Sequence, residues 1–133
     1  TSAGTKIVIV DAGMTDLIRP ALYGAKHKIE NLTSATGSEK YTIGGPICES
    51  SDIFGRDVEL PVTSRGDLLT LRSAGAYGMA MASRYNLQDL PGAVYSDKLP
   101  NKALIQSALF FDVRFSVRKH LGDDGTRYRY RSL

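Results

Sequence analysis

The chain has 133 residues, of which 42% are hydrophobic and 23% are charged, and its formal net charge is +3. These proportions are typical of one soluble domain with a hydrophobic core, and they exclude a disordered protein. The single cysteine excludes an internal disulfide framework, and no cluster of cysteine and histidine has the spacing of a zinc site.

Targeting and membrane signals are missing from the sequence. No run of about 18 apolar residues is present, and residues 1–5 lack the basic and apolar segments of a signal peptide. We therefore expect a cytoplasmic protein in a reducing compartment, with no membrane partner.

Short β signals begin at the N-terminus and recur along the chain, separated by glycine, proline and small polar residues. Lys6–Val10 is an apolar, β-branched run that ends at Asp11-Ala12-Gly13, where glycine permits a turn. The spacing of such runs is typical of an all-β barrel or sandwich. We therefore expect a mainly β fold.

One short helix is expected after the first strand. Residues 14–24 carry apolar side chains at helical spacing, with a threonine and an aspartate at 15–16 able to cap the start and a glycine placed to end it. Pro20 restricts the helix to a short one, because proline is tolerated only in a first turn. Arg19 and Tyr23 are four residues apart and would project from the same side.

The segment Gly44-Gly45-Pro46-Ile47-Cys48-Glu49-Ser50-Ser51-Asp52 concentrates chemistry in a predicted rigid turn. Such a turn would hold the thiol of Cys48 beside the carboxylate of Glu49. A lone cysteine also occurs as a small buried apolar residue, so both interpretations stay open on local spacing. A thiol hydrolase using Cys48 and His27 lacks an orienting third group and an oxyanion site in the sequence.

A glycine-rich segment, residues 73–86, follows a predicted strand at Leu68–Leu71. Tyr77 is flanked there by small residues, which leaves room for a ligand or another chain to approach its ring and hydroxyl. The alternative is a buried tyrosine whose hydroxyl bonds to the backbone.

The C-terminal residues have the two-residue period of half-buried strands. Apolar and polar side chains alternate from Phe111 to Arg118, glycines and aspartates occupy residues 122–125, and tyrosine alternates with arginine from Arg127 to Arg131. This pattern predicts a β-hairpin at about residues 110–131.

The positive charge lies in the same tail. Residues 101–133 hold seven basic and three acidic side chains, whereas residues 1–100 hold ten basic and eleven acidic ones. A basic strand with tyrosines suits nucleic acid, but an amphipathic strand gives the same alternation without a ligand. We expect no nucleic-acid partner and keep a basic-tail nucleic-acid-binding module as an alternative function.

Several motifs occur together in a fixed order along the chain. They are Asp11-Ala12-Gly13-Met14, Asp16 to Tyr23, Gly45 to Ser50 with Asp52, Gly66-Asp67, Gly75 to Gly78, and Ser83 with Tyr85-Asn86. The ordered set resembles the C-terminal β domain of the diaminopimelate decarboxylases, pyridoxal-phosphate enzymes of lysine biosynthesis. The resemblance covers residues 7–95, leaves residues 96–133 unmatched, and implies a single Greek-key-like β-barrel or sandwich domain over residues 1–133.

The resemblance also implies roles for five residues. Arg19 and Tyr23 correspond to the pair that binds the distal carboxylate of the substrate, and Glu49 corresponds to the acceptor of its distal ammonium. Cys48 resembles the acid that returns a proton to the α-carbon, and Tyr77 resembles the tyrosine at cofactor and substrate. Related ornithine and arginine decarboxylases usually carry aspartate after the equivalent cysteine, so Glu49 favours diaminopimelate.

The implied reaction converts meso-diaminopimelate to L-lysine and CO2, but the barrel domain that carries the family's cofactor lysine is absent from this sequence. We therefore expect the chain alone to be inactive and to bind pyridoxal phosphate weakly, and we expect a homodimer or a barrel domain in cis or in trans as its partner. We also expect the tail hairpin to complete the sheet beside Ile7–Val10. A noncatalytic dimerisation or structural β module remains an alternative.

Overall fold

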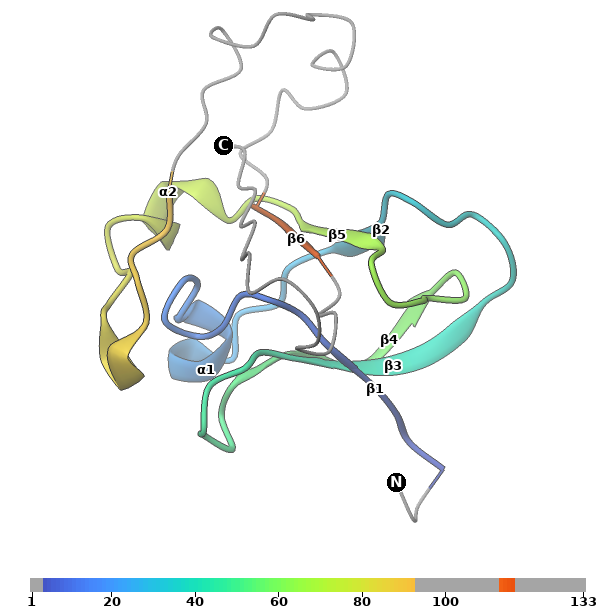
Figure 1. Ribbon diagram of the computed structural model, residues 1–133, viewed down its shortest axis with the longest axis horizontal. Coiled ribbons are helices and arrows are strands. Elements are labelled where there is room, and N and C mark those ends of the chain that lie inside the picture. The colour runs from blue at the N-terminus through green and yellow to red at the C-terminus, as the bar shows by residue number, and fades with distance from the viewer. Residues whose placement is uncertain (1–3, 93–112, 117–133) are drawn as a thin grey trace, which may run out of the picture.

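The structure is a computed structural model that describes residues 4–92 and 113–116. Its helices and strands follow one another along the chain (Figure 1) as β1 (Lys6–Ile9), α1 (Arg19–Tyr23), β2 (Ile29–Asn31), β3 (Glu39–Gly44), β4 (Ile53–Leu60), β5 (Leu68–Leu71), α2 (Gly75–Gly78), η1 (Tyr85–Leu87) and β6 (Val113–Ser116). No helix in the described ranges is long and apolar enough to span a membrane.

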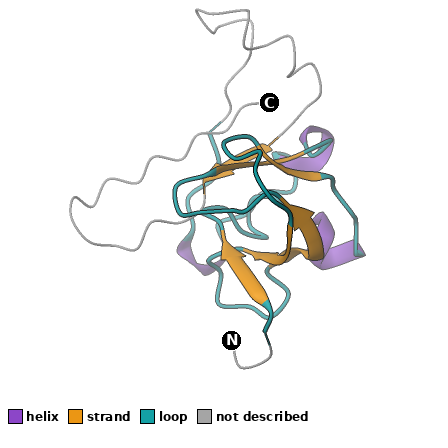
Figure 2. Cartoon of the chain, turned by 90° about the vertical axis from the view of Figure 1, so that its right-hand side faces the viewer, coloured by secondary structure: helices purple, strands orange, loops and turns teal. Residues whose placement is uncertain are grey.

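The strands form two three-stranded sheets, one in the order β1-β3-β4 and the other in the order β2-β5-β6. Strand β1 runs parallel to β3, whereas β3 and β4 are antiparallel and change register around Ile43. The second sheet is antiparallel throughout. Figures 1 and 2 show the sheets as two layers, with the short helices at one side in Figure 1.

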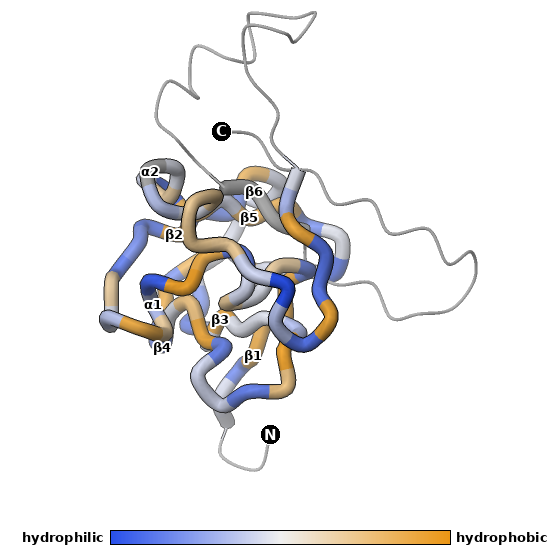
Figure 3. Tube along the Cα trace, turned by 90° about the vertical axis from the view of Figure 1, so that its left-hand side faces the viewer, coloured by the Kyte–Doolittle hydropathy of each residue, from blue (hydrophilic) through white to orange (hydrophobic). Residues whose placement is uncertain are grey.

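The hydrophobic core lies between the sheets, because one cluster of buried side chains draws on both. Its members from the strands are Val8, Ile29, Tyr41, Ile43, Phe54, Leu60, Leu69 and Leu71. Figure 3 shows hydrophobic segments gathered along these strands. The prediction of a mainly β fold with a short helix is confirmed, and in the described residues the sheets stay separate, as in a sandwich.

Helix α1 starts later than the sequence pattern predicts. Ile18 is the N-cap, no side chain caps it, and Pro20 lies in the first turn. Because proline has no N–H to donate to an earlier carbonyl, the helix cannot extend back to residues 15–16. The end is as predicted, since Gly24 adopts the left-handed conformation with a φ of 64°.

Strand β6 lies within the first arm of the predicted tail hairpin, and it pairs with β5. The expectation that the hairpin would complete the sheet beside Ile7–Val10 is wrong for this strand, because β6 belongs to the β2-β5-β6 sheet and β1 belongs to the other sheet. Strand β5, which is buried from Leu69 to Leu71, is therefore paired at both edges, by β2 and by β6. The rest of the predicted hairpin lies outside the described residues.

Candidate functional site

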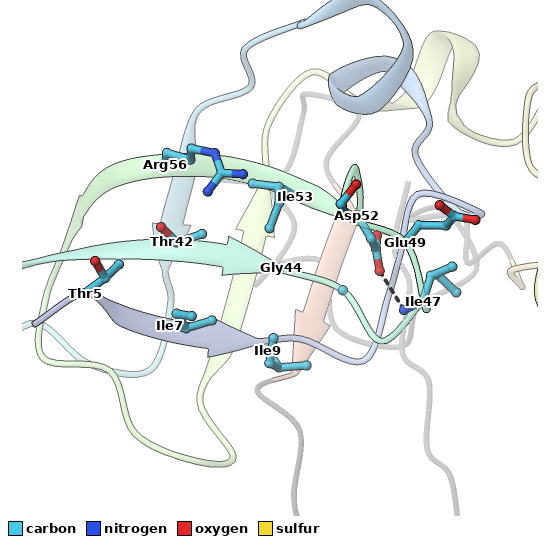
Figure 4. A pocket seen from close by; sticks show the side chains of 12 residues that line it. Thr5, Ile7, Ile9, Thr42, Gly44, Ile47, Glu49, Asp52, Ile53 and Arg56 are labelled. Carbon is cyan, nitrogen blue, oxygen red and sulfur yellow. Dashed lines mark hydrogen bonds between the residues drawn. The ribbon is translucent and has the colours of Figure 1, made fainter. Parts of the chain in front are cut away.

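The turn of residues 44–52, which we call the braced turn, joins β3 to β4 and is held by a buried carboxylate. Asp52 accepts hydrogen bonds from the backbone N–H of Ile47 at 2.7 Å and from that of Met14 at 2.6 Å. The N–H of Gly45 donates to the carbonyl of Asp52 at 3.0 Å. Figure 4 shows the bond from Ile47 to Asp52. One side chain thus ties the braced turn to the loop that follows β1.

Glycine is required where these two loops touch. A Cβ on Gly45 would lie 2.6 Å from the Cα of Gly13 and would also collide with the Asp52 carboxylate. A Cβ on Gly13 would lie 2.5 Å from Cγ1 of Ile47. The loops therefore pack backbone against backbone, which explains why both motifs carry glycine at these positions.

Burial raises the pKa of the Asp52 carboxyl, because the low-dielectric surroundings disfavour the charged form, and the hydrogen bonds from Ile47 and Met14 oppose that rise. The nearby Asp16 carboxylate adds to the rise. Asp16 accepts a hydrogen bond from the N–H of Gly13 at 2.9 Å, so it holds the loop after β1 and does not cap α1 as predicted. Two acidic side chains therefore fix the loops beneath the site.

Cys48 and Glu49 lie at the exposed tip of the braced turn. The alternative that Cys48 is a buried apolar residue is therefore wrong. The N–H of Glu49 donates to the carbonyl of Ile47 at 2.8 Å, and its carboxylate accepts a hydrogen bond from the hydroxyl of Tyr85. The turn therefore presents a thiol and a carboxylate at consecutive exposed positions on a hydrogen-bonded backbone.

Arg19, Tyr23 and Tyr77, which we call the arginine–tyrosine group, come together where α1 meets α2. The Arg19 guanidinium carbon lies 5.8 Å from the ring centroid of Tyr23 and 5.0 Å from that of Tyr77. Tyr77 is 55% exposed, so the alternative of a buried tyrosine is wrong. A guanidinium stacked on rings keeps its N–H edge available for a carboxylate.

A pocket of about 390 Å³ lies next to the arginine–tyrosine group and is rich in basic side chains. Its lining includes Arg19, Lys26, His27, Lys28, Arg72 and Tyr77. Lys28 and Arg72 form ion pairs with Glu30 and lower the pKa of that carboxyl. Nδ1 of His27 lies 3.0 Å from the carbonyl oxygen of Arg72. His27 therefore contacts the Arg72 backbone, and no hydrogen bond within the described ranges pairs it with Cys48 as a thiol hydrolase would need.

The five residues that the resemblance singles out fall into two places. No hydrogen bond, ion pair or ring contact joins the arginine–tyrosine group to Cys48 or Glu49 among residues 4–92 and 113–116. The segment that follows Tyr77 is linked to the loop after β1, because the N–H of Ser83 donates to the carbonyl of Thr15 at 2.9 Å. The same loop is tied to the braced turn by the hydrogen bond from Met14 to Asp52. Within the described part of the chain, no group of three or more His, Cys, Asp or Glu side chains is placed to hold a metal ion.

Asp52 and Tyr85 belong to the ordered motifs, but the motifs indicate no role for either residue. An aspartate at the end of a glycine-proline turn is a recognisable signal for backbone bracing. Nothing in the spacing of Tyr85 indicates that it reaches Glu49, because the two residues are 36 positions apart.

Comparison with known proteins identifies the family. The pyridoxal-dependent decarboxylase C-terminal sheet domain matches residues 1–75. The chain belongs to this family. It is 61% identical over 94 residues to the diaminopimelate decarboxylase of Bacteroides thetaiotaomicron, covering 71% of this chain and 24% of that enzyme. The chain thus spans about a quarter of the length of that relative.

Solved structures agree with this assignment. The diaminopimelate decarboxylase of Methanocaldococcus jannaschii superposes with a TM-score of 0.64 at 48% identity, over 65% of this chain and 20% of that one. Lysine decarboxylase from Selenomonas ruminantium gives a TM-score of 0.68 at 23% identity, over 78% of this chain and 28% of that one, and shows a shared fold. The resemblance drawn from the ordered motifs is confirmed.

Proposed function

We propose that this chain is the C-terminal domain of a diaminopimelate decarboxylase, which converts meso-diaminopimelate to L-lysine and CO2. The observation that carries the proposal is the presence, in one family domain, of a ring-stacked guanidinium at Arg19 and an exposed carboxylate at Glu49. The end of diaminopimelate that does not react is itself zwitterionic. It requires one cationic and one anionic partner, because a charge buried without a partner is costly.

Arg19 binds the distal carboxylate in this proposal, together with the hydroxyl of Tyr23. A planar guanidinium forms two parallel hydrogen bonds with a carboxylate, which fixes the orientation as well as the charge of the ligand. The rings of Tyr23 and Tyr77 hold the guanidinium by cation–π contact and limit its rotation.

Glu49 accepts the distal ammonium, and Cys48 donates the proton that the α-carbon receives after CO2 has left. Their place at the tip of the braced turn suits both roles, because the backbone beneath them is fixed by Asp52. A proton donor acts efficiently only when its position relative to the accepting carbon is fixed.

Pyridoxal phosphate supplies an electron sink when it is bound in enzymes of this family. The described residues of this chain fit one edge of such a cofactor, because the Tyr77 side chain is exposed beside a basic pocket that suits an anionic group. They provide no complete binding site, so we propose that a barrel domain supplies the rest. The isolated chain is then inactive and binds the cofactor weakly.

The separation of the two groups supports a site shared between subunits. The arginine–tyrosine group would serve one barrel, and Cys48 with Glu49 would serve the barrel of the partner in a homodimer. The test uses full-length subunits in which this chain is joined to a barrel domain. Subunits that carry Cys48→Ala are mixed with subunits that lack the cofactor lysine of the barrel. Each variant alone is expected to be inactive, and the mixture is expected to regain activity. A mixture that stays inactive would contradict a shared site.

The outer face of the β1-β3-β4 sheet is apolar and exposed, which favours a covering segment from elsewhere in the complete enzyme. Ile7 and Ile9 are 49% and 38% exposed and line a hollow of about 460 Å³ on the outer face of the β1-β3-β4 sheet (Figure 4). Thr42 and Ile53 line the same hollow. We propose that chain preceding the barrel covers this apolar face in the complete enzyme.

A chimera tests the substrate and the reaction together. In it, this chain replaces the matching segment of the Bacteroides thetaiotaomicron enzyme, and CO2 release is measured with diaminopimelate, ornithine and lysine. The expected result is turnover of diaminopimelate and a loss of about 100-fold in kcat/KM when Arg19 is replaced by alanine. Equal turnover of lysine or ornithine would show that the substrate assignment is wrong.

A noncatalytic dimerisation module is the second candidate, and exposed apolar side chains near the site favour it. Leu22 is 54% exposed, Met79 is 44% exposed, and Leu87 is 98% exposed. These side chains suit a protein interface. A chain that dimerises alone, together with a chimera that folds and dimerises without releasing CO2, would support this second candidate.

A further inference from the structure

Tyr85 and Glu49 form a contact between two loops that the assigned roles leave unexplained. The hydroxyl of Tyr85 donates a hydrogen bond to Oε1 of Glu49. Both side chains are exposed, so burial does not force them together. In the described part of the chain, no other hydrogen bond reaches the Glu49 carboxylate.

The backbones beneath these two side chains are anchored to the same loop. On one side, the N–H of Asp52 donates to the carbonyl of Glu49 at 3.1 Å, and Asp52 in turn accepts from the N–H of Met14. On the other side, the N–H of Ser83 donates to the carbonyl of Thr15 at 2.9 Å. Because Met14 and Thr15 are adjacent, the segments that carry Tyr85 and Glu49 are both hydrogen-bonded to the loop that follows β1.

The segment that carries Tyr85 adopts a conformation that requires support. Asn86 and Leu87 both have a φ of 55°, in the left-handed region that non-glycine residues rarely occupy. Leu87 is 98% exposed, so no apolar burial offsets its strain. A hydrogen bond from the N–H of Gln88 to the carbonyl of Tyr85, at 3.3 Å, closes the turn. Tyr85 therefore begins a strained turn that is closed by one backbone hydrogen bond.

We propose that Tyr85 is a positioning residue that orients the Glu49 carboxylate toward the distal ammonium of the substrate, and so helps to select substrates that carry this group. The inference rests on the proposed function, which assigns Glu49 to that ammonium. Tyr85 occupies Oε1, which leaves Oε2 to accept an N–H from the substrate. A tyrosine suits the task because only two side-chain torsions must be ordered.

The electrostatics of the pair are consistent with this arrangement. The hydrogen bond to Glu49 and the charge of its carboxylate raise the pKa of the Tyr85 phenol. The protonated phenol is therefore favoured, and it remains a donor throughout the neutral pH range. Loss of the hydroxyl would leave Glu49 free to adopt other rotamers, and productive binding of the ammonium would become less frequent.

The contact itself is tested on the chain as it is. NMR of isotope-labelled tyrosine follows the ionisation of Tyr85 in the unaltered chain and in Glu49→Gln, with Tyr85→Phe to assign the signal. We expect the pKa of Tyr85 to fall toward its ordinary value of about 10 in Glu49→Gln. An identical pKa in both proteins would overturn the proposal.

The functional consequence is tested in the chimera with two ligands: diaminopimelate, and an analogue that lacks the distal amino group. Tyr85→Phe is expected to raise KM for diaminopimelate about tenfold with kcat nearly unchanged. Binding of the analogue is expected to be unaffected. An equal loss for both ligands, or no loss for either, would overturn the role of Tyr85.

Tyr41→Phe is the matched control, because Tyr41 donates to Glu39 in a second tyrosine–glutamate hydrogen bond that lies on β3. It is expected to change stability and to leave KM for both ligands unchanged. A chimera that is inactive with all native side chains would contradict the proposed function and, with it, the role of Tyr85. An active chimera in which Tyr85→Phe behaves like the native protein would contradict the role of Tyr85 alone.

Discussion

The braced turn and the arginine–tyrosine group each hold a charged side chain at the surface, but different interactions hold it in the two regions. In the braced turn, a buried carboxylate binds two backbone N–H groups, and glycines allow the loops to touch. In the arginine–tyrosine group, a guanidinium stacks on two exposed rings of short helices.

The difference separates stability from recognition. Side chains under the braced turn contribute to folding, because removing them leaves buried N–H groups without partners. Side chains of the arginine–tyrosine group are largely solvated and contribute little to folding. Substitutions that reduce activity should therefore lower the free energy of unfolding strongly under the braced turn and only slightly in the arginine–tyrosine group.

The largest effect is expected for Asp52→Ala. The N–H groups of Met14 and Ile47 lose their acceptor in a site where Asp52 is 3% exposed. We expect the free energy of unfolding to fall by about 3 kcal/mol, measured by urea denaturation of the chain. Asp89→Ala is the control, because Asp89 is exposed, and it should change nothing measurable. If Asp52→Ala changed the free energy of unfolding as little as Asp89→Ala does, the braced turn would not differ in stability from the arginine–tyrosine group.

A loss of about 2 kcal/mol is expected for Gly45→Ala, because the added Cβ must displace Gly13 or the Asp52 carboxylate. Gly92→Ala is the matched control, since a Cβ there meets no atom within 4 Å. Thermal unfolding of both variants measures the difference. Equal melting temperatures for the two would show that the loops do not pack backbone against backbone.

The arginine–tyrosine group should give the opposite pattern. Arg19→Ala removes contacts to two exposed rings and is expected to lower the free energy of unfolding by only about 0.5 kcal/mol. The same change is expected to reduce kcat/KM of the chimera by about 100-fold. A stability loss as large as that of Asp52→Ala would show that Arg19 supports the fold.

The smallest effect is the pH dependence contributed by Asp52. Because its pKa is raised above the ordinary 3.8, the folded chain binds this proton more tightly than the unfolded chain does. The contribution of this titration to stability is therefore full below 3.8 and is lost as pH rises through the raised pKa. Unfolding measured against pH should show this decline in the native chain and not in Asp52→Asn. A decline of the same size in both would assign it to other groups.

Local sequence patterns are sufficient to predict some elements and not others. The β-branched run at β1 and Gly24 at the end of α1 act through neighbouring residues, so they can be predicted. The start of α1 lies later than its pattern predicts, because the restriction imposed by Pro20 outweighs the capping residues before it.

Contacts between distant loops leave no such pattern. Asp52 binds Met14 across 38 residues, and Tyr85 reaches Glu49 across 36, and neither separation gives a periodic signal. The partner of β6 is also beyond local patterns, because alternation shows that a strand has one buried face but does not show which strand it joins. The motifs locate the site, and the structure supplies the contacts that hold it.

CO2 release from diaminopimelate by the chimera, with and without Cys48→Ala, measures whether this domain takes part in the decarboxylation and whether Cys48 donates the proton. We expect the native chimera to turn over diaminopimelate, and we expect Cys48→Ala to lower kcat by about 100-fold or more without changing the free energy of unfolding. A chimera that folds and dimerises but releases no CO2, or one that is insensitive to Cys48→Ala, would contradict this expectation.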